Sequence, residues 1–551
     1  MKRVLALLLV SLLVVSLFAG CQPKASEPTE TAAPEATTEA PAAEPVATVL
    51  KWNIGSDPKT IDPTLTGASD GGNVVHNTFE GLVREKSGVV HPGIAESWEV
   101  SEDGLTYTFK LRESKWSDGS PLTANDFVYS WKRGMDPKTA SEYAWIWEYT
   151  NVVGAFEATS GGSLDAVGVK ALDDYTLEVK LSTPTEYFVS LVSFYHFKPV
   201  KQSAVEAKAD GAWAKDPALT VSNGPFTLTS YEIGKGLTLT KNPNYWDAAN
   251  VKLEAIEANF IDEASTAYQA YQAGELHYIP QVPTAEVPKL IAENPEFHIF
   301  PLLGTYYYNF NLKNEIFKDP KVRRAMSLAI DRELITETLG AGQMPAVGFV
   351  PPGFIDAEGK DFNEVQGDLG LPTDLSKVEE AKALMAEAGY PEGKGFPEFT
   401  ILYNTSEGHK LVAELVQEML KTNLGISVKL ENQEWAVFQD TRKAGNYEMA
   451  RGGWLTDYMD PSGLLSIFTT GNAYNDPKYS NADYDALLSK SAKARGKEHF
   501  DALYAAEKML ITDLPIIPIY HYTESMLVKE NFVGWDRSVL GTVDFSLAEF
   551  K

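Results

Sequence analysis

The chain has 551 residues, of which 44% are hydrophobic and 23% charged, so it holds apolar material for more than one core. Asp and Glu number 76 against 48 Lys and Arg, which gives a formal net charge of −28. A surface this acidic repels phosphate backbones, so nucleic acid is not expected as a partner. The single cysteine, Cys21, excludes an internal disulfide, a cysteine-based zinc site and an iron–sulfur cluster.

The N-terminus has the pattern of an export signal. Two basic residues precede a long apolar run, and small residues lie directly before Cys21. Ala-Gly before a cysteine resembles a bacterial lipobox, although Phe18 stands where Leu is most common. We therefore expect residues 1–20 to be a lipoprotein signal peptide and Cys21 to be lipidated. A retained transmembrane anchor is the alternative.

Residues 21–48 are rich in Pro, Ala, Thr and Glu and contain almost no large side chain. Prolines block regular structure and the glutamates repel one another, so we expect an extended acidic tether. Such a tether suits a folded body that reaches away from a membrane. The expected location is the extracytoplasmic face of a cell membrane, which is the periplasmic space if an outer membrane is present.

The body mixes strand and helix patterns. Segments 106–111 and 176–181 alternate apolar and polar side chains, as half-buried strands do. Thr123 and Asp126 have capping-box spacing at the start of a helix. The first half of the body is richer in hairpin-like strands.

Further helix signals follow in the second half. Asp319 before a proline predicts the start of a helix that Gly340 ends. Ser376 and Glu379 form another candidate capping box. A helix over 411–420 lies between apolar strands at 399–403 and 426–430, so this crossover unit predicts an α/β domain with partly parallel pairing.

Enzyme signatures are not found. The sequence contains no GxSxG elbow, HExxH pair or phosphate loop, and its eight histidines lack metal-ligand spacing. Asp457 and Asp460 have the spacing of an acid–base pair, but such pairs arise by chance among 76 acidic residues. We expect no catalytic residue, no metal and no cofactor.

Aromatic residues lie close to a few charges and to bare backbone. Tyr306, Tyr307 and Tyr308 are consecutive, so in a strand alternate rings face opposite sides. Either one ring faces a cleft or all pack in a core. Two glycines follow Arg451. Glycine inside a strand marks either a site where a ligand comes close to the backbone or a bulge in the strand.

Three blocks of sequence resemble one family of bacterial proteins. The blocks are 91–98 with 106–128, 223–226 with 242–246, and 322–332. They resemble the family-5 solute-binding proteins of ABC importers over essentially all of residues 50–551. The resemblance implies a two-lobed, periplasmic-binding-protein-like α/β fold with mixed sheets, three domains and a ligand cleft between the lobes. It divides the chain into domain I at 49–79, 206–305 and 524–551, domain II at 80–205, and domain III at 306–523.

Narrower matches at 402–409, 431–435, 440–442 and 450–458 are similar to the oligopeptide-binding branch. This resemblance implies that Asp457 holds the α-ammonium of a peptide and that Gly453, Trp454 and Leu455 pair with its backbone. It implies that Arg442, Arg451 and His409 meet carboxylate ends, and that Trp435, Trp454, Tyr143, Tyr306, Tyr307 and Tyr308 line side-chain pockets. The alternatives are a surface ion pair for each arginine, a helix-start position for His409 and an unpaired surface carboxylate for Asp457.

One departure from this branch concerns the start of the body. Peptide-binding relatives carry an acidic residue shortly after the Asp-Pro pair, where this chain has Thr66, so Thr66 is a candidate determinant of the preferred peptide length or side chain. The expected partners are short peptides, the permease subunits of an ABC importer, and the membrane through the lipid anchor at Cys21, with the protein itself a monomer. A family member that binds oligosaccharide or another small solute, and a tethered surface hydrolase, are the alternative functions.

Overall fold

The computed structural model describes residues 48–208 and 211–551. The expected signal peptide, Cys21 and the tether up to residue 47 lie outside the described residues. Within the described ranges, no helix combines the length and the apolar character needed to cross a membrane.

The largest sheet has eleven strands drawn from distant parts of the chain. In spatial order its strands are β10 (Phe226–Glu232), β11 (Gly236–Lys241), β12 (Ala255–Asn259), β1 (Val49–Asn53), β13 (Tyr278–Ile279), β19 (Ile516–Val528), β14 (Phe297–Phe310), β18 (Met449–Leu455), β16 (Phe399–Asn404) and β17 (Val428–Gln433), with β15 (Met344–Pro345) beside β19. Pairing is parallel for β1 with β12 and for β16 with β17, and antiparallel for β14 with β18 and β19. The sheet is therefore mixed, as predicted.

The predicted crossover unit is confirmed. Strand β16 leads through α13 (Glu407–Leu424) into β17, which lies parallel to β16. Gly425 ends α13 in the left-handed conformation that glycine adopts without steric cost. Buried side chains recur along α13 at helical spacing, so one face of this helix packs on the sheet.

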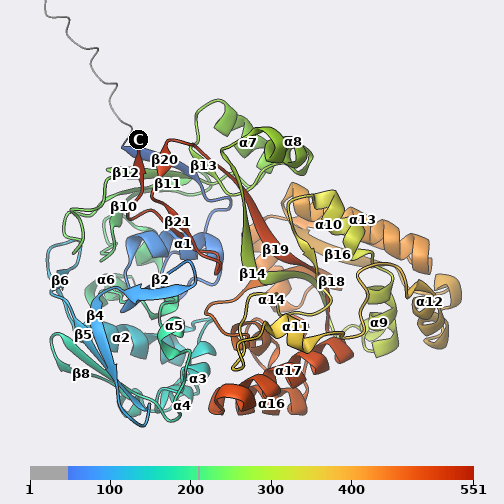
Figure 1. Ribbon diagram of the computed structural model, residues 1–551, viewed down its shortest axis with the longest axis horizontal. Coiled ribbons are helices and arrows are strands. Elements are labelled where there is room, and N and C mark those ends of the chain that lie inside the picture. Colours follow the sequence, from blue (N-terminus) through green and yellow to red (C-terminus); the bar gives the residue numbers. More distant parts are fainter. Residues whose placement is uncertain (1–47, 209–210) are drawn as a thin grey trace, which may run out of the picture. The chain divides into compact units, whose positions relative to one another are not determined.

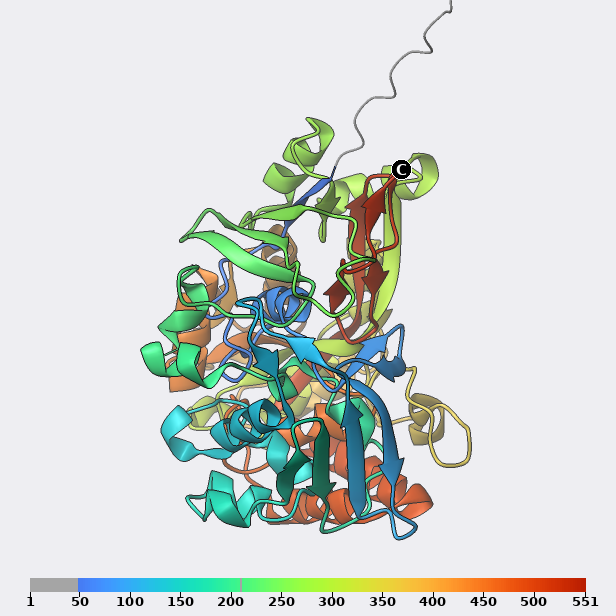
Figure 2. The same ribbon diagram turned by 90° about the vertical axis from the view of Figure 1, so that its left-hand side faces the viewer.

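A second sheet of four strands carries the predicted alternating segments. Its order is β4 (Ala95–Val100), β5 (Thr106–Leu111), β9 (Thr176–Lys180) and β8 (Val169–Asp173), all antiparallel. Figure 2 turns the side of the molecule that carries this sheet toward the viewer. Leu177, Val179 and Leu181 are all buried, as their spacing predicts.

The described residues also contain four small antiparallel pairs, seventeen α-helices and eight short 3-10 helices. The pairs are β2 (Val83–Lys86) with β3 (Val89–Pro92), β6 (Ser114–Lys115) with β7 (Pro121–Leu122), β20 (Phe532–Val533) with β23 (Glu549–Phe550), and β21 (Asp536–Arg537) with β22 (Val543–Asp544). The helices are α1 (Ser69–Thr78), α2 (Ala124–Met135), α3 (Ile146–Tyr149), α4 (Ala155–Thr159), α5 (Phe188–Leu191), α6 (Gln202–Ala207), α7 (Ala264–Gln272), α8 (Val287–Glu293), α9 (Pro320–Leu328), α10 (Arg332–Leu339), α11 (Phe362–Gln366), α12 (Val378–Glu387), α13, α14 (Trp435–Ala444), α15 (Ser462–Leu465), α16 (Ala482–Lys493) and α17 (Gly496–Asp513).

Helix starts were predicted with mixed success. The capping box of Thr123 with Asp126 is present at the start of α2. The expected single helix from Asp319 to Gly340 is two helices, because Asp331 accepts a hydrogen bond from the Leu334 amide at 2.9 Å and caps a new helix, α10.

The second capping box does not form. Lys377, not Ser376, precedes the first residue of α12 and has no side-chain cap bond. The amide of Ser376 instead donates to the side chain of Asp374 at 3.0 Å, so Ser376 belongs to the turn before the helix.

The two lobes are joined by long strands of the largest sheet. Strands β14 and β19 lie side by side and run between the two halves of Figure 1. Their pairing is interrupted between the pairs Pro301–Thr523 and Thr305–His521. The expected domain borders at 305/306 and 523/524 fall inside these two strands, and all the domain borders remain predictions.

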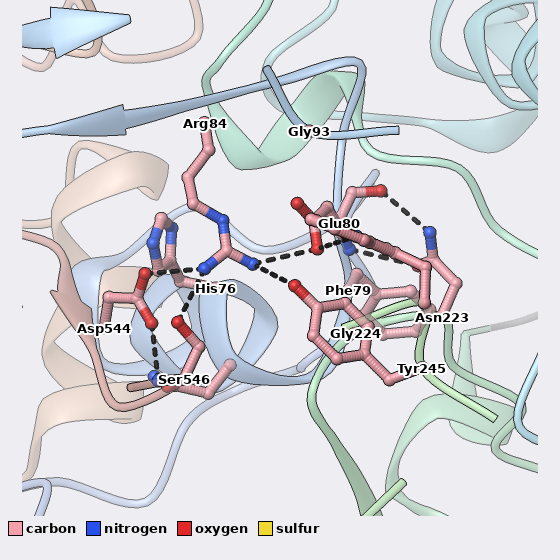
Figure 3. A network of polar contacts seen from close by, with 12 residues as sticks. His76, Phe79, Glu80, Arg84, Gly93, Asn223, Gly224, Tyr245, Asp544 and Ser546 are labelled. Carbon is pink, nitrogen blue, oxygen red and sulfur yellow. Dashed lines mark hydrogen bonds and ion pairs between the residues drawn. The ribbon is translucent and has the colours of Figure 1, made fainter. Parts of the chain in front are cut away.

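A buried charged network holds the C-terminal segment against the chain that follows α1 (Figure 3). The guanidinium of Arg84 donates to Asp544 at 2.7 Å, Ser546 at 2.8 Å, Glu80 at 2.9 Å and Tyr245 at 3.0 Å. Burial raises the pKa of Asp544, but Arg84, with smaller contributions from His76, Lys86 and Ser546, more than offsets this effect, so that pKa lies well below its usual range. The network therefore joins residues more than 450 positions apart beside the cavity described next.

Candidate functional site

A cavity of about 460 Å³ lies between the lobes, in the size range of small-molecule sites. One wall comes from residues 306–523 and includes the end of β18, the start of α14 and part of β19. The other wall comes from α1, the 193–195 segment, the 278–284 segment and the C-terminal strands. Nine of the predicted site residues line it: Tyr143, His409, Trp435, Arg442, Arg451, Gly453, Trp454, Leu455 and Asp457.

Strand β18 presents an unpaired edge in this cavity. One edge of β18 pairs with β14 along its whole length, from Met449 to Leu455. The other edge pairs with β16 only at Met449 and Ala450. Among the described strands, none pairs with that edge over residues 451–455, so an extended chain can be added there by backbone hydrogen bonds.

Asp457 lies just beyond the free edge and is 7% exposed. The Tyr143 hydroxyl donates to its Oδ1 at 3.1 Å, and Oδ2 has no hydrogen-bond partner among the described residues. Burial raises the pKa of Asp457 well above its usual range, and the Tyr143 bond lowers it only in part. This carboxylate therefore lacks the cation that a buried carboxylate requires.

The two predicted arginines differ in their partners. Arg442 forms an ion pair with buried Asp476, with Nε 2.7 Å from Oδ2, and its Nη1 donates to the Arg451 carbonyl at 3.2 Å. Arg451 donates to the Tyr522 hydroxyl at 2.6 Å and lies 5.0 Å from the Tyr306 ring centre. In the part of the chain that the structure describes, no carboxylate lies within ion-pair distance of Arg451. Arg451 is thus the better placed of the two to meet an added anion.

His409 lies in the first turn of α13, where its amide bonds to the Ser406 cap. Burial lowers the pKa of His409 well below its usual range, and the charge of Arg451 lowers it further. Its ring is therefore neutral in this state, so it can offer a hydrogen bond but no positive charge to a carboxylate.

The three consecutive tyrosines do not line the cavity. Tyr306 and Tyr308 lie in one hydrophobic core and Tyr307 in another, as strand alternation requires, and all three are buried. The core-packing interpretation describes their surroundings. The Tyr306 ring also packs against the Arg451 guanidinium. Thr66 is also absent from the cavity wall: a side chain on Gly71 would meet its hydroxyl, so Thr66 packs beneath the start of α1.

The glycine pair in β18 is explained by close packing. A Cβ on Gly452 would lie 2.5 Å from the ring of Tyr307, and one on Gly453 would lie 2.2 Å from the Tyr522 hydroxyl. Gly453 lines the cavity and Gly452 does not. The absence of side chains at both glycines makes room for the neighbouring tyrosine rings. At Gly453 it also exposes the backbone to the cavity.

Several cavity residues escaped the sequence reasoning. They are Asp70, Phe194, Tyr195, Lys443, Tyr474, Tyr520 and Tyr522. The alternation of Tyr520 and Tyr522 along a strand was a usable signal for a wall of rings. Nothing local marked Asp70, which sits in a polar, glycine-rich helix with no apolar stripe.

Contacts across the cavity hold the two lobes together. Besides the bond between Tyr143 and Asp457, the Trp435 indole donates to Asp70 at 3.0 Å, and Lys59 pairs with Asp440 at 2.7 Å. Lys443 pairs with Glu142, and burial lowers the pKa of Lys443 although Glu142 opposes this change. These bonds span residues far apart in sequence, so the structure shows the lobes closed on one another.

Comparison with known proteins identifies the family. The model of the bacterial extracellular solute-binding proteins, family 5 Middle, matches residues 89–476. The chain belongs to this family. Its members are binding proteins, so the chain is a binding protein and not an enzyme, and the expected family and two-lobed α/β fold are confirmed.

Family-5 relatives resemble the chain over most of its length. The dipeptide-binding protein DppE of Bacillus subtilis is 36% identical over 508 residues, which cover 91% of this chain and 92% of DppE. The structure of Haemophilus influenzae OppA in complex with RPPGFSPFR has a TM-score of 0.85 and 34% identity, covering 92% of this chain and 99% of that one.

A third relative is informative about the closed arrangement. The Escherichia coli murein tripeptide binding protein MppA is 34% identical, and one of its structures gives a TM-score of 0.84 over 92% of this chain and 98% of that one. The unliganded open form of MppA gives only 0.60 at the same identity, over 90% and 98%. The lobes of this chain are therefore arranged differently from those of that open form.

Proposed function

We propose that this protein captures short peptides in extended form at the outer face of a cell membrane and delivers them to an ABC importer. The observation that carries the proposal is the buried Asp457 carboxylate without a cation, at the end of the free edge of β18. Peptides share a backbone and two charged ends, whatever their side chains. A strand edge, an anion and a cation in one cavity match those shared groups.

The assignment of charges follows from the partners found in the structure. Asp457 would receive the α-ammonium, residues 453–455 would pair with the peptide backbone, and Arg451 would meet the α-carboxylate. Arg442 is already paired with Asp476, so it would serve a carboxylate only as a second donor. His409 would add a neutral donor, and Trp435, Trp454 and Tyr143 would flank the peptide side chains.

Removing either partner of the proposed pair, the Asp457 carboxylate or the α-ammonium of the peptide, tests the proposal. Asp457→Ala should weaken binding of tri- and tetrapeptides by about 30-fold to several-thousand-fold, because it leaves a buried ammonium unpaired. N-acetylation of the peptide should cost the wild type a similar factor. The two losses should not add, since both delete one interaction. Calorimetric titration of both proteins with free and acetylated peptides measures all four affinities.

Two results would overturn the proposal. One is wild-type protein that binds acetylated peptides as tightly as free ones. The other is oligosaccharide, and no peptide, in the mass spectrum of ligand retained after purification, which would favour a sugar-binding member of the family.

The lipid anchor and the importer are parts of the same proposal. Cys21 after Ala-Gly and the acidic tether support attachment to the membrane. The similarity to dipeptide- and oligopeptide-binding proteins supports delivery to a peptide importer, with permease subunits as partners. The protein would act as a monomer.

A further inference from the structure

The charges on the cavity wall do not balance. The lining cations are Arg442, Lys443, Arg451 and Arg537, and the lining carboxylates are Asp70, Glu85, Asp262, Glu407, Asp457 and Glu524. Three of the cations already have ion-pair partners, namely Asp476, Glu142 and Glu524. A ligand with one ammonium and one carboxylate would satisfy Asp457 and Arg451 and would leave the wall with excess negative charge.

Asp70 is one of the lining carboxylates that have no cation partner among the described residues. Its Oδ2 accepts the Trp435 indole N–H at 3.0 Å, and its Oδ1 accepts the Gly71 amide at 2.6 Å. No Lys or Arg of the described chain lies within ion-pair distance of it. Burial raises the pKa of Asp70 to about 6, although these bonds and the more distant Lys215 oppose the rise. Each oxygen keeps a free lone pair for a further donor.

The other lining carboxylates accept hydrogen bonds as Asp70 does. Glu85 accepts from the Gly88 amide and the Ser538 hydroxyl, one on each oxygen. Glu407, at the exposed start of α13, accepts from Ser265, and Asp262 accepts from Ser56. Asp70 differs from them in its hydrogen bond to Trp435 across the cavity and in its position near Tyr195, which Asp457 also approaches.

Tyr195 links Asp70 to the ammonium anchor. Its ring lies against Gly72 of α1, where a Cβ would be only 2.5 Å from Cε1. Burial raises the pKa of Tyr195, and the negative charges of Asp457 and Asp70 both raise it further. Both carboxylates thus lie near one phenol, so a peptide anchored at Asp457 would bring the side chains of its amino-terminal residues toward Asp70.

We infer that Asp70 selects peptides with a basic side chain near the amino terminus. A Lys or Arg head group would donate to the open lone pairs of Asp70. The Trp435 ring beside it offers an aromatic face, which attracts cations. A neutral side chain would leave the carboxylate without a counter-charge in a closed cavity, which is unfavourable. This inference rests on the proposed peptide-binding function and names the substrate class of the same site.

A set of matched tetrapeptides tests the inference. The set is tetra-alanine and its variants with lysine at position 1, 2 or 3, titrated calorimetrically into the wild type, Asp70→Asn, Asp70→Glu and Glu102→Gln. Glu102 is exposed and does not line the cavity, so its variant controls for the change in net charge. The readout is the affinity of each lysine peptide divided by that of tetra-alanine in the same protein.

We expect the wild type to bind at least one lysine peptide about tenfold more tightly than tetra-alanine. The ratio should fall close to one in Asp70→Asn, which keeps an acceptor for Trp435 but removes the charge. Asp70→Glu and Glu102→Gln should keep the preference. A purely structural role for Asp70 would change all affinities together and leave the ratio unaltered.

Two outcomes overturn the inference, and they are distinct from failure of the proposed function. Wild-type ratios near one at every position show that Asp70 selects nothing, and an unchanged ratio in Asp70→Asn assigns the selection to another group. In both cases the peptides still bind. If no peptide binds the wild type at all, the proposed function itself fails.

Discussion

Replacement of Arg84 by methionine should strongly destabilise the body of the protein. Arg84 satisfies four buried groups at once: Asp544, Ser546, Glu80 and Tyr245. Methionine keeps much of the side-chain volume but leaves two buried carboxylates without their main cation. Removing one partner from a buried ion pair costs about 3–5 kcal/mol, so we expect the free energy of unfolding in urea to fall by that amount at pH 7.

Lys86→Met is the matched control. Lys86 lies 3.4 Å from the same oxygen of Asp544, but its side chain is 26% exposed, so its loss should cost less than about 1 kcal/mol.

The pH dependence of the Arg84 effect has a defined sign. Because the folded-state pKa of Asp544 is depressed, its contribution is present above the unfolded value of about 4 and fades below it. Equal losses for both variants, or an Arg84 effect that grows in acid, would refute the reasoning.

Two further predictions concern binding and processing. Since the pKa of Asp457 is raised by burial, pairing with a peptide ammonium should release a proton, and the binding enthalpy should differ between phosphate and Tris buffers; a buffer-independent enthalpy would contradict this. Affinity should accordingly rise with pH until the peptide amine itself deprotonates. A Cys21→Ser variant should remain an uncleaved precursor without acyl chains, and normal processing in its mass spectrum would rule out lipidation at Cys21.

Local pattern predicted local structure well. Segment 106–111 is a strand with the expected buried face, because alternation along six residues depends only on neighbouring side chains. The helix after Asp319 was predicted too long, because the capping role of Asp331 competes with continued helical spacing. Hydropathy alone does not decide that competition.

The site depended on contacts that sequence spacing does not encode. The free edge of β18 exists because β16 stops pairing after Ala450, and these two strands lie far apart in the chain. Whether Arg442 is free or paired depends on Asp476, which approaches only after folding. Asp457 and Arg451 were predicted because the resemblance to a family supplied the missing tertiary information.

The free edge of β18 also bears on which chains can enter the site. Unpaired strand edges on a protein surface promote aggregation, since the edge of another folded sheet can join them. Here the edge lies inside a cavity of about 460 Å³, which is too small for a folded domain. With the lobes closed as in this structure, only a short, extended chain fits beside it. In the proposed function, the recess therefore acts as a filter on the conformational state of the ligand, and it protects neighbouring copies of the protein from pairing through their sheets.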